Sequence, residues 1–354
     1  MRNFQLDASK EWGGEPLLSD VGEMEILKRI RTWLEERSHL GREGGFLTLG
    51  AGDDAALIRP RASTQLALTC DIHLEGRHFL TQRMTPRDVG RRVMVSNISD
   101  LAAMGATPRV ALISMALPKS DPVDVLFNIL EGLAEELKDA GGQIAGGNLS
   151  ATDGPRVVDV TLVGEVEGDA FLRSGAQAGD VILLIGHTGL SAAGLWAMDR
   201  LSKKSQKMKI DETNLKAALR FYIRPRHHLK ESLKLREMGG VKALIDTSDG
   251  LLSDLGHLCE AGGLGADIQT EQIPILEPVR KMGKAAKIDP LEWALGSSDD
   301  YALLAAVAPG SVERILSALS PQAHAIGEFV MEPGLHLLGH NNLNTKGWDH
   351  FKSG

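Results

Sequence analysis

Acidic side chains stand at three places in the first half of the chain where an apolar segment meets a turn. They are Asp53 and Asp54 in GAGDDAAL, Asp71 in LTCDIHLEGRHF, and Asp100 in SNISDLAAMG. Taken singly, each fits a helix cap or a turn residue. Together, with no histidine or cysteine cluster nearby, they favour a hard cation held by oxygen ligands. Because Mg²⁺ usually shares its coordination with substrate phosphates, the pattern indicates nucleotide chemistry.

A fourth acidic stretch lies in the second half, in IDTSDGLLSDLGHL. Asp246, Ser248 and Asp249 fall in a predicted strand-to-helix turn, where Ser248 or Asp249 fits a helix cap. The functional interpretation makes the two aspartates metal ligands and Ser248 a phosphate donor. The chain has no GxxxxGK[ST] motif, and GHTGLSAAG does not match a dinucleotide fingerprint, so neither standard nucleotide loop is present.

The stretch GGNLSATDG, residues 146–154, has two adjacent glycines where the backbone can approach a charged ligand. An acidic residue after Gly146 and Gly147 would make this a loop for a metal-bound nucleotide, but Asn148 stands there. The residues alone leave two interpretations open: a metal site that lost a charge, or a surface turn.

The bulk composition limits the class of protein. The chain has 354 residues and a formal net charge of −8, which argues against nucleic acid or an anionic membrane as the main partner. Its two cysteines are far apart and form no disulfide framework, the N-terminal residues lack the basic-then-apolar pattern of a signal peptide, and no apolar run reaches membrane-spanning length. A reducing cytoplasm is therefore the expected location.

The elements that must position these residues follow from periodicity and punctuation. Apolar residues at helical spacing predict a helix over 21–37 with Met24, Leu27, Ile30 and Leu34 on its buried face. Further helices are predicted over 85–105 and 121–142. Near residue 170 a strand, turn and helix order begins again. We expect an α+β (mixed α/β) protein with a loose arm over 1–20 and domains over 21–168 and 169–354.

A set of short motifs makes the chain resemble thiamine-monophosphate kinases. In chain order they are GDDAAL, EGRHF, SDLAAMGATP, LRSGAQAGD, DTSDGLLSDLGH, DDYALL and a terminal GWDHF. The resemblance runs from about residue 20 to residue 351. It implies the two-domain fold of the aminoimidazole-ribonucleotide-synthetase superfamily, with N-terminal strands forming a barrel across a homodimer. The implied reaction is Mg²⁺-assisted transfer of a phosphoryl group from ATP to thiamine monophosphate, with several Mg²⁺ ions.

The resemblance also implies roles for single residues, and it makes Asp71, Asp100 and Asp249 catalytic. The implied metal ligands are Asp54, Thr69, Cys70, Asp71, Asp100, Asn148, Asp246 and Asp249. The first domain is implied to bind ATP and metal and to dimerise. The implied ATP-binding residues are Gly146, Gly147, Asn148, Arg173 and Ser248, and the implied substrate-binding residues are His78, Asp299 and Trp348.

The chain departs from the family pattern at several of these positions. Cys70 replaces a common threonine, Asn148 replaces an aspartate, and Asp299 with two preceding serines replaces a Gly-Glu pair. An asparagine carbonyl still coordinates Mg²⁺ but brings no charge. Two alternatives therefore stay open: a non-catalytic or altered-substrate paralogue that binds thiamine phosphates or nucleotide, and another ATP-dependent enzyme of the same superfamily.

Overall fold

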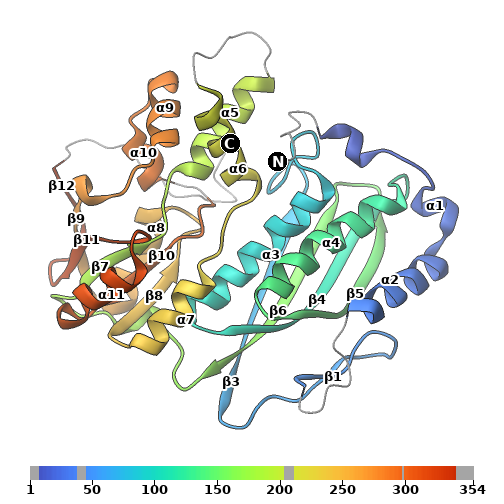
Figure 1. Cartoon of the computed structure of the whole chain (residues 1–354), viewed down its shortest axis with the longest axis horizontal. Helices are drawn as coiled ribbons and strands as arrows, with labels where there is room; N and C mark the ends of the chain where they lie inside the picture. The colour runs from blue at the N-terminus through green and yellow to red at the C-terminus, as the bar shows by residue number, and fades with distance from the viewer. Residues whose placement is uncertain (1–7, 38–44, 203–210, 297–298, 340–354) are drawn as a thin grey trace. The chain divides into compact units, whose positions relative to one another are not determined.

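The computed structural model describes residues 8–37, 45–202, 211–296 and 299–339 (Figure 1). The chain forms two compact units. The first holds the chain up to Leu101 and Ala106–Asp169, and the second holds Ala102–Gly105 and the chain from Ala170 onwards. The domain bounds 21–168 and 169–354 and the roles assigned to them stay predictions.

The first unit contains a four-stranded sheet in the order β3-β6-β4-β5. Strands β3 and β4 both pair antiparallel with β6, and β5 pairs parallel with β4. Its elements are η1 (Ser9–Trp12), α1 (Leu18–Val21), α2 (Glu23–Arg37), β1 (Leu47–Leu49), β2 (Leu57–Ile58), β3 (Thr64–Leu74), α3 (Pro86–Ala103), β4 (Thr107–Pro118), α4 (Val123–Asp139), β5 (Gln143–Thr152) and β6 (Val157–Glu167).

Helices α3 and α4 cover one face of this sheet (Figure 1). Alternate residues of β6 point to that face, where Val158, Val160 and Leu162 are fully buried. The opposite face carries exposed apolar side chains, and Leu68 and Ile72 of β3 are 67% and 54% exposed. Strand β3 therefore has one face in the core and one face whose apolar side chains the described residues leave exposed.

A pair of glycines sets the distance between α3 and α4. A Cβ at Gly90 would lie 2.1 Å from the carbonyl oxygen of Ile129, and a Cβ at Gly132 would lie 2.1 Å from that of Arg87. Any larger residue would collide with backbone of the other helix, which cannot rotate away as a side chain can. The two helices cross in close contact because both positions are glycine.

The N-terminal residues differ from the loose arm expected over 1–20. Residues 8–21 contain η1 and α1, and Trp12 and Leu18 are only 8% and 9% exposed. Their apolar side chains are buried because they pack on this unit, which a polar, Gly/Pro-punctuated sequence does not predict. Residues 1–7 lie outside the described part of the chain.

Helix α2 forms as predicted, but it buries a different face. Ile26 and Leu34 are buried, whereas Met24 is 81% and Leu27 is 40% exposed. Positions 26, 30 and 34 are one turn apart and also satisfy the helical period. The contact of α2 with β5 selects this alternative face.

The second unit has a six-stranded sheet in the order β12-β9-β11-β7-β10-β8. Its elements are η2 (Arg173–Gly175), β7 (Val181–Ile185), α5 (Leu190–Ser202), α6 (Glu212–Ile223), α7 (Leu229–Met238), β8 (Val241–Asp246), α8 (Leu251–Gly262), β9 (Gly265–Gln269), η3 (Thr270–Gln272), α9 (Glu277–Ala286), α10 (Pro290–Leu295), β10 (Leu303–Val307), η4 (Pro309–Ser311), α11 (Val312–Leu319), β11 (Ala323–Val330) and β12 (Gly334–Leu338).

Helices α8 and α10 share one hydrophobic core with this second sheet. Leu255 and Leu258 of α8 and Leu295 of α10 pack with buried residues of the strands, among them Ile182 and Leu304. Both units combine helices with mixed or antiparallel strands, so the predicted mixed α/β class is confirmed. Within the described ranges, no helix has the length and apolarity needed to cross a membrane.

Candidate active site

Strand β3 and helix α3 bring together the first group of predicted residues. Thr69 and Asp71 are two residues apart on β3 and point to the same face, and Ser96 and Asp100 are one turn apart on α3. The Thr69 hydroxyl donates a short hydrogen bond to the Asp100 carboxylate. Ser96 hydrogen-bonds to Asp71. Two carboxylates and two hydroxyls thus face one another between the strand and the helix.

The electrostatics of Asp71 fit a cation site. Burial raises the pKa of Asp71, and the nearby negative charge of Asp159 raises it further, while the Ser96 hydrogen bond lowers it. A cation bound at Asp71 would offset the cost of burying this carboxylate. Carboxylate and hydroxyl oxygens are ligands that Mg²⁺ accepts.

Cys70 and Asp54 do not join this group through their side chains. Because strand residues alternate, Cys70 points to the other face of β3, where its thiol lies 3.6 Å from the Asp159 carboxylate and 3.5 Å from the Thr161 hydroxyl. Only the Cys70 carbonyl therefore remains for the predicted metal role. Asp54 lies in the exposed turn before β2, where its N–H donates to Asp53.

The prediction of a loop over residues 146–154 is wrong for most of its length, because residues 146–152 belong to strand β5. Asn148 pairs with Ser114 of β4 and is exposed. A Cβ at Gly147 would lie 1.8 Å from the Ile113 carbonyl oxygen, so parallel pairing with β4 explains this glycine. At Gly146 the nearest atom would be 3.8 Å away, so packing does not require a glycine there.

His78 lies in the turn that follows β3. Its Nδ1 accepts the N–H of Leu74 at 3.0 Å, and its own N–H donates to the Leu74 carbonyl at 3.0 Å. An Nδ1 that accepts a hydrogen bond leaves the proton of the neutral ring on Nε2. His78 is half-buried, so the ring is held in one orientation with a donor on its far side.

In the second unit, the end of β8 and the start of β10 are adjacent. Asp246, the last residue of β8, pairs with Leu303 of β10 and is buried. Thr247 is tied to the segment before β10, because its N–H donates to Ala302 and its carbonyl accepts from Tyr301. The predicted residues Asp246, Ser248 and Asp249 thus lie along the segment that begins at Asp299.

Asp254 holds the turn that carries Ser248 and Asp249. Its carboxylate accepts the N–H groups of Asp249 at 3.1 Å and Gly250 at 3.2 Å, and it also accepts that of Ser248. It is only 3% exposed. Burial, with the neighbouring charge of Asp249, raises the pKa of Asp254 to about 7. Sequence analysis missed this residue, although its position in the first turn of a predicted helix was an available signal.

Asp300 is a second residue that sequence analysis missed. It accepts the N–H groups of Gly189 and, at 2.8 Å, Ser191 at the start of α5. It therefore fixes the segment next to Asp299 to the turn after β7.

Two further predicted site residues are Arg173 and Trp348. Arg173 is exposed in η2, and Trp348 lies outside the described residues.

The donor sets within each unit fit Mg²⁺. Within the described residues, no group of three or more His, Cys, Asp or Glu side chains forms a preassembled metal cage. Mg²⁺ usually takes one or two protein carboxylates and completes its shell with waters and substrate phosphates. The pair Asp71 and Asp100 in the first unit, and the pair Asp246 and Asp249 in the second, meet that requirement.

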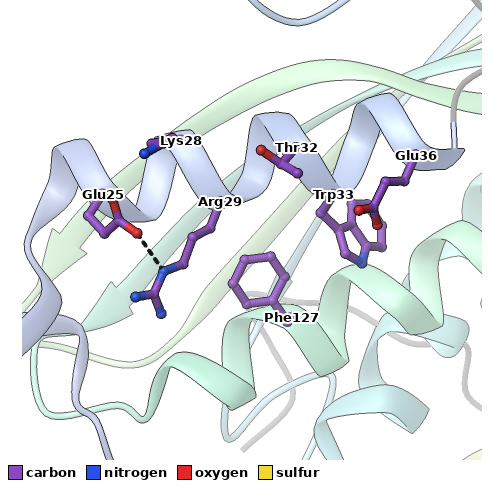
Figure 2. A pocket seen from close by; sticks show the side chains of 7 residues that line it. All are labelled: Glu25, Lys28, Arg29, Thr32, Trp33, Glu36 and Phe127. Atoms are coloured by element: carbon purple, nitrogen blue, oxygen red, sulfur yellow. Dashed lines mark hydrogen bonds and ion pairs between the residues drawn. The ribbon is translucent and has the colours of Figure 1, made fainter.

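A surface pocket of about 290 Å³ lies between α2 and α4, away from these groups (Figure 2). Its lining includes Trp33, Arg29 and Phe127, with Arg29 paired to Glu25 at 3.0 Å. None of the predicted site residues lines it.

The two halves of the chain match two domains of one superfamily. Residues 52–166 match AIR synthase related protein, N-terminal domain, and residues 177–339 match AIR synthase related protein, C-terminal domain. The chain is thus an AIR-synthase-related protein. Within that class, it belongs to the thiamine-monophosphate kinase family, because curated members are 30% to 34% identical over most of its length. The resemblance seen in the sequence is confirmed.

Three of the most similar proteins show the extent of the match. The thiamine-monophosphate kinase of Buchnera aphidicola subsp. Schizaphis graminum is 34% identical, over 85% of this chain and 92% of its own length. A crystal structure of the Stenotrophomonas maltophilia enzyme is 29% identical with a TM-score of 0.75, over 89% and 96%. The AaThiL complex with AMPPCP and TMP is 28% identical with a TM-score of 0.72, over 96% and 100%.

Proposed function

We propose that this chain transfers the γ-phosphoryl group of ATP to the phosphate of thiamine monophosphate. The products are ADP and thiamine diphosphate. An oxygen of the substrate phosphate attacks the γ-phosphorus, and the bond from that phosphorus to the β,γ-bridging oxygen breaks. Family membership and the relative solved with AMPPCP and TMP support this reaction. The observation that carries it in this chain is the pair of half-buried carboxylates, Asp71 and Asp100, each of which accepts a hydrogen bond from a hydroxyl group.

The chain's own contribution is positioning and charge control, because phosphoryl transfer asks little covalent chemistry of a protein. When bound, Mg²⁺ neutralises the phosphate oxygens that would otherwise repel. Asp71 and Asp100 in the first unit and Asp249 in the second would each bind such an ion, and Thr69 and Ser96 orient Asp100 and Asp71. The further metal ligands in this proposal are Asp54, Asp246, the Cys70 carbonyl and the Asn148 carbonyl.

The remaining roles concern the two substrates. Gly146, Gly147, Arg173 and Ser248 bind ATP in this proposal, with β5 and not a loop supplying the two glycines. His78 donates from Nε2 to the substrate phosphate. Asp299 and Trp348 contact the thiamine part. Free cysteines at Cys70 and Cys259 are consistent with a reducing cytoplasm as the working compartment.

We also propose a homodimer built on the open face of the first sheet. Leu66, Leu68, Ile72 and Leu112 are 40% to 67% exposed on β3 and β4. Large apolar side chains exposed together on one face of a sheet mark an interaction surface. A second copy of the chain presents the same face and would cover it, with the barrel across the twofold as the expected arrangement.

The test is a direct assay of the purified protein with ATP, Mg²⁺ and thiamine monophosphate. Thiamine diphosphate and ADP are expected in equal amounts. Asp71→Asn or Asp249→Asn should lower kcat roughly a hundredfold or more, about 2.7 kcal/mol of transition-state stabilisation, without unfolding the protein. Asp124→Asn, on the exposed side of α4, serves as the matched control and should keep parental activity.

The same assay separates the alternatives. ATP hydrolysis without thiamine diphosphate would indicate another ATP-dependent enzyme of the superfamily. Binding of thiamine monophosphate or nucleotide with no turnover would indicate a non-catalytic paralogue. If Asp71→Asn unfolds the protein but its folded fraction keeps full activity, the carboxylate is structural.

A further inference from the structure

The N-terminal segment, residues 8–18, packs against the turn that carries His78, and it lies outside residues 52–166 that match the family. We propose that this segment holds the His78 turn, residues 74–81, in the conformation that binds thiamine monophosphate, and that Trp12 is its positioning residue. The inference deepens the proposed function and rests on it.

The central contact is between Trp12 and Phe79, the residue after His78. Their rings are stacked, with centroids 6.4 Å apart and planes 7° from parallel. The Trp12 Nε1–H donates to the Met84 carbonyl at 2.8 Å, and the N–H of Ala8 donates to the Gln82 carbonyl at 3.1 Å. Phe79 is 1% exposed, so the stacked indole forms part of the surface that encloses it.

Trp12 also contacts the charged residue that holds the other end of the turn. The Arg156 guanidinium lies 4.8 Å from the centre of the Trp12 ring. Arg156 pairs with Glu75 at 2.8 Å, and Glu75 accepts a hydrogen bond from Thr81 at 3.0 Å. The indole thus touches the turn directly at Phe79 and indirectly at Glu75.

The segment is itself fixed to the body of the first unit. The N–H of Leu18 donates to the Asp121 carbonyl at 2.8 Å, and the N–H of Val123 donates to the Pro16 carbonyl at 2.9 Å. The Asp121 carboxylate also accepts from Arg156 at 2.7 Å. One set of contacts therefore joins the N-terminal segment, Arg156 and the His78 turn.

The turn depends on this support because Phe79 and Thr81 are the two buried residues among residues 74–81. The backbone hydrogen bonds within the turn are those of a short turn. The N–H of Gly76 donates to the Phe79 carbonyl at 2.8 Å, and the N–H of His78 donates to the Leu74 carbonyl. If Phe79 loses its stacking partner, the turn can open and the His78 ring loses its fixed direction. Misplacement of a substrate contact raises the KM of that substrate more than that of the other one.

The experiment compares Trp12→Ala, Trp12→Phe and Trp33→Ala with the parent. Trp33 is the matched control, because it lies in the same unit and an arginine, Arg37, lies 4.4 Å from the centre of its ring. Trp33 lines the pocket between α2 and α4, and no residue of the His78 turn lines that pocket (Figure 2). Trp12→Ala should raise the KM for thiamine monophosphate roughly five- to tenfold and leave the KM for ATP within about twofold. Trp12→Phe keeps the stacked ring and should restore most of the parental value. Trp33→Ala should leave both KM values unchanged.

Hydrogen–deuterium exchange of the peptide spanning residues 74–81 gives a second readout that needs no activity. Trp12→Ala should speed exchange of this peptide, and Trp33→Ala should not. If Trp12→Ala does not fold, Trp12→Leu fills most of the space without stacking and takes its place in both measurements. Unchanged exchange, or equal rises in both KM values, would overturn the inference. If the parent makes no thiamine diphosphate, the proposed function fails while the exchange measurement still decides whether Trp12 holds the turn.

Discussion

Asp254 shows how one buried side chain can hold several proposed ligands in place. Three successive backbone N–H groups, from Ser248 to Gly250, point at its carboxylate. Such an arrangement fixes the direction of the Asp249 side chain without touching a ligand. Asp254 is therefore a positioning residue for the turn. Residues that hydrogen-bond to metal ligands commonly orient them in this way.

Replacing Asp254 should weaken Mg²⁺ and ATP binding selectively. We expect Asp254→Ala to raise the Mg²⁺ and ATP concentrations for half-maximal rate roughly tenfold, which corresponds to about 1.4 kcal/mol. Asp254→Asn keeps one acceptor oxygen and should have a smaller effect, and the KM for thiamine monophosphate should not change. The measurement is a set of rate titrations in each of the three ligands.

Asp180 offers a control for the loss of a buried carboxylate. It is 1% exposed, accepts the N–H of Gln177 at 2.7 Å and pairs with Lys242 at 2.8 Å in the same unit. Asp180→Asn should lower stability without shifting the Mg²⁺ titration. Equal shifts for Asp180→Asn and Asp254→Asn would show that the effect is general destabilisation.

Among the elements, strand β3 separates two functions by its alternation. Thr69 and Asp71 face α3, and Leu68, Cys70 and Ile72 face the open side. One strand can thus carry the proposed metal ligands on one face and the proposed dimer contacts on the other.

A charge on the open face should therefore block self-association. Leu68→Lys, at a side chain that is 67% exposed, should shift the protein from dimer to monomer at micromolar concentration, because a buried unpaired lysine is strongly disfavoured at an apolar interface. Sedimentation velocity measures this directly. Met24→Lys, at an 81% exposed residue of α2, is the control and should remain dimeric. A parent protein that is already monomeric and active contradicts the dimer proposal.

On the scale of the whole molecule, the second unit holds several half-buried histidines in the neutral state. Burial lowers the pKa of His187 to about 4, helped by repulsion from His324, His228 and Arg226. Burial also lowers the pKa of His227 to about 4 and lowers that of His324. Because the folded pKa lies below the unfolded value near 6.5, the unfolded chain takes up protons first as the pH falls.

Stability should consequently fall on acidification between about pH 6.5 and pH 4. For His187, we expect a loss of about 1 to 2 kcal/mol at roughly pH 5 relative to pH 7.5. His187→Gln should remove that share of the fall, as measured by urea unfolding at both pH values. His257→Gln, at an exposed position of α8, should leave the fall unchanged. A parental free energy of unfolding that is flat across this range would contradict the prediction.

The sequence predicted the elements with strong local signals and missed those that depend on distant partners. Helices α3 and α4 begin near a proline and end near a glycine, and both were expected close to their observed bounds. The adjacent glycines of β5 are typical of a loop, so the sequence predicts a loop where the structure has a strand. Gly147 is explained by the close approach of the Ile113 carbonyl of β4, which local sequence does not indicate. Trp12 likewise gave no sign of burial, since its partners Phe79, Met84 and Arg156 are far along the chain. The proposed site residues were recognised by motif, whereas the role of Asp254 and Asp300 became clear from the backbone N–H groups that they accept.

The crossing of α3 and α4 restricts how this lineage can change over time. A side chain at Gly90 would collide with the main chain of α4, and a side chain at Gly132 would collide with the main chain of α3. No replacement at one position can make room for a replacement at the other, so compensating double substitutions are closed to this pair. Both glycines should be inherited unchanged wherever α3 must hold Ser96 and Asp100 at their present height above β3. Neutral substitutions in the first unit should then accumulate at surface positions that do not affect the contact between α3 and α4.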